Sequence, residues 1–85
     1  MQKITMYSTQ WCADCRNAKR FLKDAGIAYD EIDIDQNDTA AQQVIDWSGG
    51  RRVIPTFHIK DINIPEPVIL HNPPIQKLAL TLGIK

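Results

Sequence analysis

The sequence predicts an α/β fold with the element order β-α-β-α-β-β-α, in which a four-stranded mixed sheet is flanked by three helices. Two cysteines, Cys12 and Cys15, lie between a strand-like run and a segment with helical spacing. Three segments place apolar residues at helical intervals. Strands joined through a helix must be parallel, and strands joined by a short connection are expected to be antiparallel. Together these observations predict the mixed sheet.

The first half of the chain supplies two strand–helix pairs. Residues 3–7 form a β-branched and aromatic run without breakers, which predicts a strand. Residues 14–25 are predicted to be a helix that ends before Gly26. Alternating apolar residues predict a second strand over 27–34. A second helix is predicted over 39–48, with Asn37 or Asp38 as its N-cap and Ala41, Val44, Ile45 and Ser48 on one face.

The second half predicts a strand pair and a last helix. Residues 56–59 are expected to be a strand, 60–63 a turn, and 68–70 a short strand. Two prolines exclude a helix over 64–67. Asn72 is the expected N-cap of the last helix and Pro73 its first residue. Its inner face is predicted to consist of Ile75, Leu78, Ala79 and Leu82.

Size and charge narrow the function classes. The chain has 85 residues, which suits a single domain over 1–85, and ten basic residues balance ten acidic ones. A net charge of zero argues against nucleic acid as the partner. We expect no membrane association, because no signal-peptide region and no run of about 20 apolar residues is present. A cytoplasmic location and a monomer are the corresponding expectations. In a reducing compartment, two cysteines indicate catalysis or metal binding.

The spacing of Cys12 and Cys15 indicates thiol–disulfide exchange. The thiolate is the reactive form of cysteine, and a helix N-terminus stabilises negative charge through its free N–H groups and its dipole. Cys12 at this position would attack a disulfide. Cys15 lies one helical turn further along the same face, where it can resolve the mixed disulfide. We therefore predict Cys12 as the nucleophile and Cys15 as the resolving thiol.

Two segments, Tyr7–Cys15 and Val53–Thr56, resemble the glutaredoxin branch of the thioredoxin fold. The resemblance covers essentially the whole chain, and the first segment is most similar to mycoredoxins and other bacterial glutaredoxins. It implies a thioredoxin fold with a cis bond between Ile54 and Pro55. It also implies substrate-binding roles for Trp11, Arg52, Val53, Ile54 and Pro55, with the backbone of Ile54 pairing with the substrate.

The same resemblance implies disulfide-containing proteins as substrates, and it leaves the electron donor open. No tightly bound cofactor is expected, and glutathione, mycothiol or a thioredoxin reductase are the candidate donors. Thr9 stands where glutathione-dependent members carry a cation. Pro73 and Pro74 replace their glycine-rich turn and lack N–H groups. Arg51 and Arg52 are the cations that would partly compensate. Asp14 replaces the usual aromatic residue between the cysteines.

Two other function classes fit the cysteine pair less well. A zinc site needs two further ligands, and His58 and His71 lie far along the chain, so no metal ligands are predicted. An iron–sulfur cluster shared by a dimer would need an external thiol. A redox-sensing binding module would use the closing of the Cys12–Cys15 disulfide to change partners.

Overall fold

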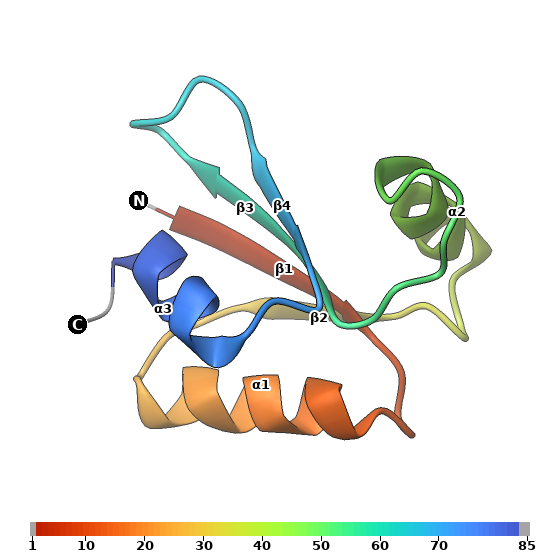
Figure 1. The fold of residues 1–85 in the computed structure, drawn as a ribbon, viewed down its shortest axis with the longest axis horizontal. Coiled ribbons are helices and arrows are strands. Elements are labelled where there is room, and N and C mark those ends of the chain that lie inside the picture. Colours follow the sequence, from red (N-terminus) through yellow and green to blue (C-terminus); the bar gives the residue numbers. More distant parts are fainter. Residues whose placement is uncertain (1, 84–85) are drawn as a thin grey trace.

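We describe residues 2–83 from a computed structural model, and the predicted order of elements is confirmed. Figure 1 shows the arrangement. The elements are β1 (Gln2–Ser8), α1 (Ala13–Asp24), β2 (Asp30–Asp33), α2 (Asp38–Trp47), β3 (Thr56–Asp61), β4 (Val68–His71) and α3 (Ile75–Leu82). The sheet has the strand order β2-β1-β3-β4. β1 pairs with β2 in parallel, and the other two pairings are antiparallel, so the sheet is mixed as predicted.

Helices cover the two faces of the sheet unequally. α1 and α3 lie on one face, and α2 lies on the other near the C-terminal end of β1 (Figure 1). The larger core cluster lies under α1 and α3 and includes Met6, Leu22, Phe57 and Leu78, all fully buried. The smaller one joins α2 to the opposite face. Ile4 and Met6 of β1 therefore enter the larger cluster and Tyr7 the smaller one, because consecutive residues of a strand point to opposite faces.

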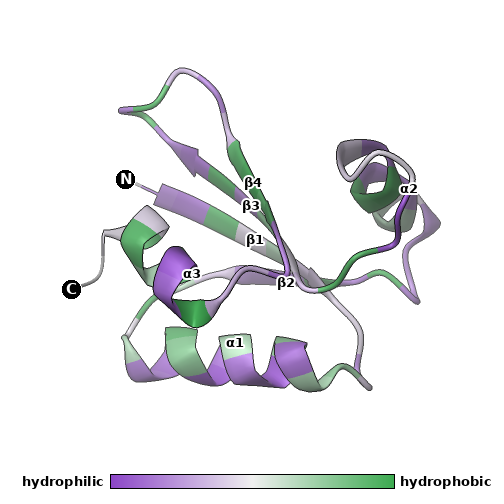
Figure 2. Cartoon of the chain, viewed as in Figure 1, coloured by the Kyte–Doolittle hydropathy of each residue, from purple (hydrophilic) through white to green (hydrophobic). Residues whose placement is uncertain are grey.

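The helices are held by one apolar face each. Figure 2 shows that α1 alternates between apolar and polar residues along its length. Its buried residues are Cys15, Ala18 and Leu22, at intervals of three and four residues. In α2 the buried residues are Ala40 and Val44, and the side chain of Asn37 caps the helix by accepting from the N–H of Ala40 at 3.0 Å. Ala41 and Val44 of the predicted inner face pack against the smaller cluster, together with Ala40 and Trp47, which the prediction left out.

Two strand boundaries also differ from the prediction. β2 begins at Asp30, because the preceding residues still complete the end of α1. There the N–H of Ile27 donates to the carbonyl of Leu22 at 2.9 Å. β3 continues through Lys60 and Asp61, which pair with Lys3 and Gln2 of β1, and the turn begins only at residue 62. Pairing with β1 extends β3 into the residues that local sequence placed in the turn.

The start of the last helix was predicted wrongly. α3 begins at Ile75, and Pro74 occupies the N-cap position without a side-chain cap. Asn72 instead has a positive φ of 44°, and its N–H donates to the carbonyl of Pro55 at 2.7 Å. Asparagine tolerates this left-handed conformation better than most residues. Asn72 thus turns the chain from β4 toward α3 and ties that turn to Pro55.

Candidate active site

Cys12 occupies the N-cap of α1, as predicted. Its Sγ accepts a hydrogen bond from the backbone N–H of Cys15 at 3.0 Å. β1 ends at Ser8, so the strand delivers the cysteine to the end of the helix through the short segment 9–12. The free N–H groups and the dipole of the helix both favour negative charge on this sulfur.

Cys15 lies in a different environment from Cys12. It is completely buried, whereas Cys12 retains 6% of its exposure, and both are free thiols. The pKa of Cys15 is raised to about 12, first by burial and then by the hydrogen bond and the charge of Cys12, while the backbone of Thr9 and the charge of Lys19 act in the opposite direction. Cys15 is therefore protonated at neutral pH while Cys12 is reduced.

A polar network lies beside the two cysteines. The Glu31 carboxylate accepts from Ser8 Oγ at 2.7 Å and pairs with Lys19 Nζ at 3.0 Å. The same bond with Glu31 raises the pKa of Lys19. Lys19 thus contacts Glu31 directly and lowers the pKa of Cys15 through its charge. A hollow of about 350 Å³ opens here, lined by Ser8, Thr9, Gln10, Lys19, Glu31 and Asp33.

The segment before β3 adopts the backbone conformation that the resemblance implied. The peptide bond between Ile54 and Pro55 is cis. Pro55 is buried, and Val53 and Ile54 are half-buried. The carbonyl of Val53 accepts from Thr56 Oγ1 at 2.7 Å, and the side chain of Ile54 packs against the smaller core cluster.

Pro55 also lines a groove that begins at the first turn of α1, which we call the proline groove. It has a volume of about 270 Å³ and is lined by Asp14, Asn17, Ala18, Pro55, Asn72, Pro73, Pro74 and Ile75. Pro73 and Pro74 offer no backbone donors to a ligand. Asp14 accepts from the side chain of Asn72 at 3.5 Å. The groove therefore presents one carboxylate, two side-chain amides and apolar proline rings.

Trp11 and Arg52 are joined by a residue to which the sequence analysis gave no role. Trp11 keeps 66% of its exposure, and its Nε1 donates to Asp35 Oδ2 at 3.0 Å. Arg52 Nη2 contacts the other oxygen, Oδ1, at 2.5 Å. The bonds from Arg52 and then Trp11 lower the pKa of Asp35. Because β1 and β2 are parallel, the residues that follow each strand meet at one edge, which is the signal that places Asp35 near Trp11.

The two histidines have structural partners. His58 stacks on Trp47 with ring centroids 5.2 Å apart, and Trp47 in turn packs against Tyr7 at 5.4 Å. His71 ends β4, and its Nδ1 lies 2.9 Å from Thr56 Oγ1. Within residues 2–83, the structure gathers no group of three His, Cys, Asp or Glu side chains suited to a metal ion.

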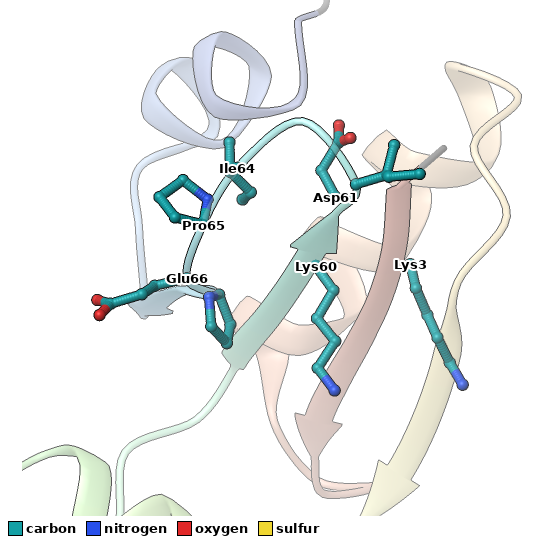
Figure 3. A pocket seen from close by; sticks show the side chains of 8 residues that line it. Lys3, Lys60, Asp61, Ile64, Pro65 and Glu66 are labelled. Carbon is teal, nitrogen blue, oxygen red and sulfur yellow. The ribbon is translucent and has the colours of Figure 1, made fainter.

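A hollow also occurs at the far end of the sheet. It has a volume of about 350 Å³ and involves the loop between β3 and β4. Figure 3 shows Lys3 and Lys60 extending side by side from neighbouring strands, with Ile64 and Pro65 on the loop. No cysteine lines this hollow, so the redox site lies elsewhere. No helix in the described part of the chain is long and apolar enough to cross a bilayer.

Comparison with known proteins supports the resemblance to glutaredoxins that the sequence indicated. The family model described as Glutaredoxin matches residues 4–62. A Mycobacterium tuberculosis protein named as a glutaredoxin is 43% identical over 58 residues, covering 68% of this chain and 69% of its own length. Mycoredoxin 1 of Corynebacterium glutamicum is 38% identical over 61 residues, covering 72% of this chain and 75% of its own.

The fold is shared with solved structures. The thioredoxin-like protein BC3987, crystallised as a point mutant, superposes with a TM-score of 0.78 at 26% identity, and the match covers 100% of both chains. The predicted thioredoxin fold is therefore confirmed.

Proposed function

Because the chain belongs to the glutaredoxin family of thiol–disulfide oxidoreductases, we propose that it reduces disulfides through a dithiol mechanism at Cys12 and Cys15. The observation that carries this proposal is the contrast between the two thiols. Cys12 Sγ lies at the helix N-terminus and accepts the N–H of Cys15, whereas Cys15 is fully buried with a raised pKa. One cysteine thus suits the attacking role and the other the resolving role.

The exchange runs in two steps. The Cys12 thiolate attacks one sulfur of the substrate disulfide, so that a mixed disulfide forms and the other substrate sulfur leaves as a thiolate. Cys15 then loses its proton and attacks Cys12 Sγ, which releases the second substrate thiol and forms the Cys12–Cys15 disulfide. Two electrons pass to the substrate.

Formation of the mixed disulfide itself activates Cys15. Two of the causes that raise the pKa of Cys15 come from Cys12, through its hydrogen bond and its charge. A sulfur in a mixed disulfide carries no charge, so both are relieved once the substrate is attached. Cys15 therefore ionises more readily when its attack is required, and Lys19 favours this ionisation.

The surroundings of the cysteines are the proposed substrate surface. Trp11 offers an exposed ring next to Cys12, and the cis segment Ile54–Pro55 with Val53 is the proposed backbone pairing site. Arg52 belongs to the same surface, because its bond with Asp35 holds it near Trp11. We propose disulfide-containing proteins as substrates and a low-molecular-weight thiol as the electron donor. Similarity to mycoredoxin 1 and the absence of backbone donors at Pro73 and Pro74 support mycothiol over glutathione.

Single cysteine variants test these roles. We expect Cys12→Ser to abolish reduction of a protein disulfide such as that of insulin. Cys15→Ser is expected to accumulate a mixed disulfide at Cys12, visible as an added mass in non-reducing mass spectrometry. Arg16→Gln, at an exposed neighbouring position, is the control for local disturbance. Full disulfide reduction by the Cys12→Ser protein would refute the assignment.

We further propose that residues 1–85 act as one domain, as a monomer, in the reducing cytoplasm. Both core clusters share the strand β1, which supports a single cooperative unit. A single unfolding transition by fluorescence and by circular dichroism would bear this out, and sedimentation gives the oligomeric state.

A further inference from the structure

Asp35 uses both of its carboxylate oxygens to connect two residues of the proposed substrate surface. Oδ2 accepts from Trp11 Nε1 at 3.0 Å, and Oδ1 contacts Arg52 Nη2 at 2.5 Å. The three residues come from three separate segments: the approach to α1, the residues after β2, and the approach to the cis proline. We call this contact the Asp35 bridge.

The bridge lies at the rim of the active site. Trp11 directly precedes Cys12, and Arg52 lies three residues before Pro55. Asp35 follows β2, whose parallel pairing with β1 matches Asp33 with Ser8. The two ends of the Asp35 bridge are therefore close in sequence to Cys12 and to the cis segment, where a bound molecule would lie.

The bridge changes the charge that this rim presents. Arg52 carries the positive charge nearest in sequence to Val53, Ile54 and Pro55, and Asp35 neutralises it. The proline groove, which begins at the first turn of α1, offers the carboxylate of Asp14, the side-chain amides of Asn17 and Asn72, and proline rings without N–H groups. Arg51 remains exposed, without an ion pair among the described residues. A thiol that bears carboxylates thus finds one cation already engaged and two carboxylates nearby.

We propose that Asp35 determines the specificity of the protein for its thiol donor, so that uncharged low-molecular-weight thiols are preferred to anionic ones such as glutathione. The inference rests on the proposed function. In the affected step, the donor thiolate attacks Cys12 Sγ of the Cys12–Cys15 disulfide, and Cys15 leaves and takes up a proton. A second donor molecule then attacks the mixed disulfide, so that two donor thiols become one disulfide.

The test compares two donors on the oxidised protein. Reduction of the Cys12–Cys15 disulfide is followed with glutathione, which is anionic, and with 2-mercaptoethanol, which is uncharged. For each variant the rate is divided by the wild-type rate with the same thiol, so that intrinsic thiol reactivity cancels. Asp35→Asn keeps an oxygen that accepts from Trp11 and removes the negative charge. Asp24→Asn, an exposed position at the far end of α1, is the matched control.

We expect Asp35→Asn to raise the relative rate with glutathione about two- to fivefold over that with 2-mercaptoethanol, as for an exposed charge pair. This gain should shrink as salt is added, because exposed charges are screened. Asp24→Asn should leave the ratio of the two rates unchanged. The double variant Asp35→Asn, Arg52→Gln should lose the gain, because the released guanidinium is its source.

Three results would overturn the inference. Equal gains with both thiols would show that Asp35 acts only by positioning Trp11. Rates equal to those of the wild type with both thiols would show that the charge of Asp35 does not select the donor. A gain that persists without Arg52 would remove Arg52 from the explanation. If neither thiol reduces the wild-type disulfide, the proposed thiol-dependent function fails, and this inference fails with it.

Discussion

At the scale of single residues, the two cysteines differ in their surroundings although they lie one helical turn apart. Cys12 caps the N-terminus of α1 and keeps 6% exposure, and Cys15 is completely buried with a pKa raised to about 12 by burial and by Cys12. One chemical difference follows for the reduced protein. At neutral pH its surface should behave as though it carried a single thiol.

We therefore predict that iodoacetamide modifies Cys12 and spares Cys15 at neutral pH, as measured by peptide mass spectrometry. Modification of Cys15 should rise only as the pH approaches about 12. In the Cys12→Ser variant, the thiol of Cys12 no longer raises the pKa of Cys15, so modification should begin at lower pH. Modification of Cys15 ahead of Cys12 near neutrality would contradict the assigned roles.

At the scale of elements, α1 joins the active site to the core. Leu22 is fully buried in the larger cluster, whereas Leu80 of α3 keeps 79% of its exposure. Leu22→Ala should lower the free energy of unfolding by about 2–5 kcal/mol through lost burial and a residual cavity. Leu80→Ala should change it by less than about 0.5 kcal/mol. Urea titration of both variants measures the difference, and equal losses would mean that α1 is not anchored through Leu22.

Local patterns predicted the elements well where a helix or strand contacts the core through one face. They failed where a distant partner decides the outcome. Lys60 and Asp61 belong to β3 because β1 pairs with them, although their local sequence suggests a turn. Asn72 resembles an N-cap beside a proline, but its N–H is taken by the carbonyl of Pro55.

The active site shows the same difference between features that depend on local sequence and features that depend on distant partners. Cys12, Cys15 and the cis proline were recognisable because their spacing is local and matches a known family. Asp35 was not, since its partners lie 24 and 17 residues away in the sequence. Only the parallel pairing of β1 with β2 brings it to the same edge as Trp11. The parallel pairing was predicted, but it does not by itself show which of the side chains that follow the two strands come into contact.

At the scale of the whole molecule, one titrating group on each face of the sheet makes stability depend on pH, and the two groups act in different pH ranges. On the α2 face, burial and then Lys60 lower the pKa of His58 from 6.5. The unfolded chain therefore binds this proton first, and stability falls as the pH drops below about 6.5. His58→Phe keeps a ring against Trp47 and should remove this part of the pH dependence.

On the face of the sheet next to α1, Glu31 affects stability at lower pH than His58 does. Burial alone would raise its pKa, but the bonds from Ser8 and Lys19 prevail and hold it below 4.5. Its contribution is complete above pH 4.5 and is lost as the pH falls through the folded-state value. Because the side chain is 35% exposed, we expect less than about 1 kcal/mol. Urea titrations at a series of pH values measure how the free energy of unfolding depends on pH. His58→Phe should flatten this dependence below about pH 6.5, and Glu31→Gln should flatten it below about pH 4.5. If both variants change the same pH range, the two groups do not act separately.

The two tryptophans give the molecule two independent optical reporters. Trp11 is exposed in the loop next to Cys12, whereas Trp47 lies half-buried in α2 and contacts Tyr7 and His58. Emission from Trp11 should respond to the state of Cys12, and emission from Trp47 to His58 protonation and to the docking of α2. With Trp11→Phe and Trp47→Phe variants, electron transfer and unfolding become separate signals from one small protein, with no added dye.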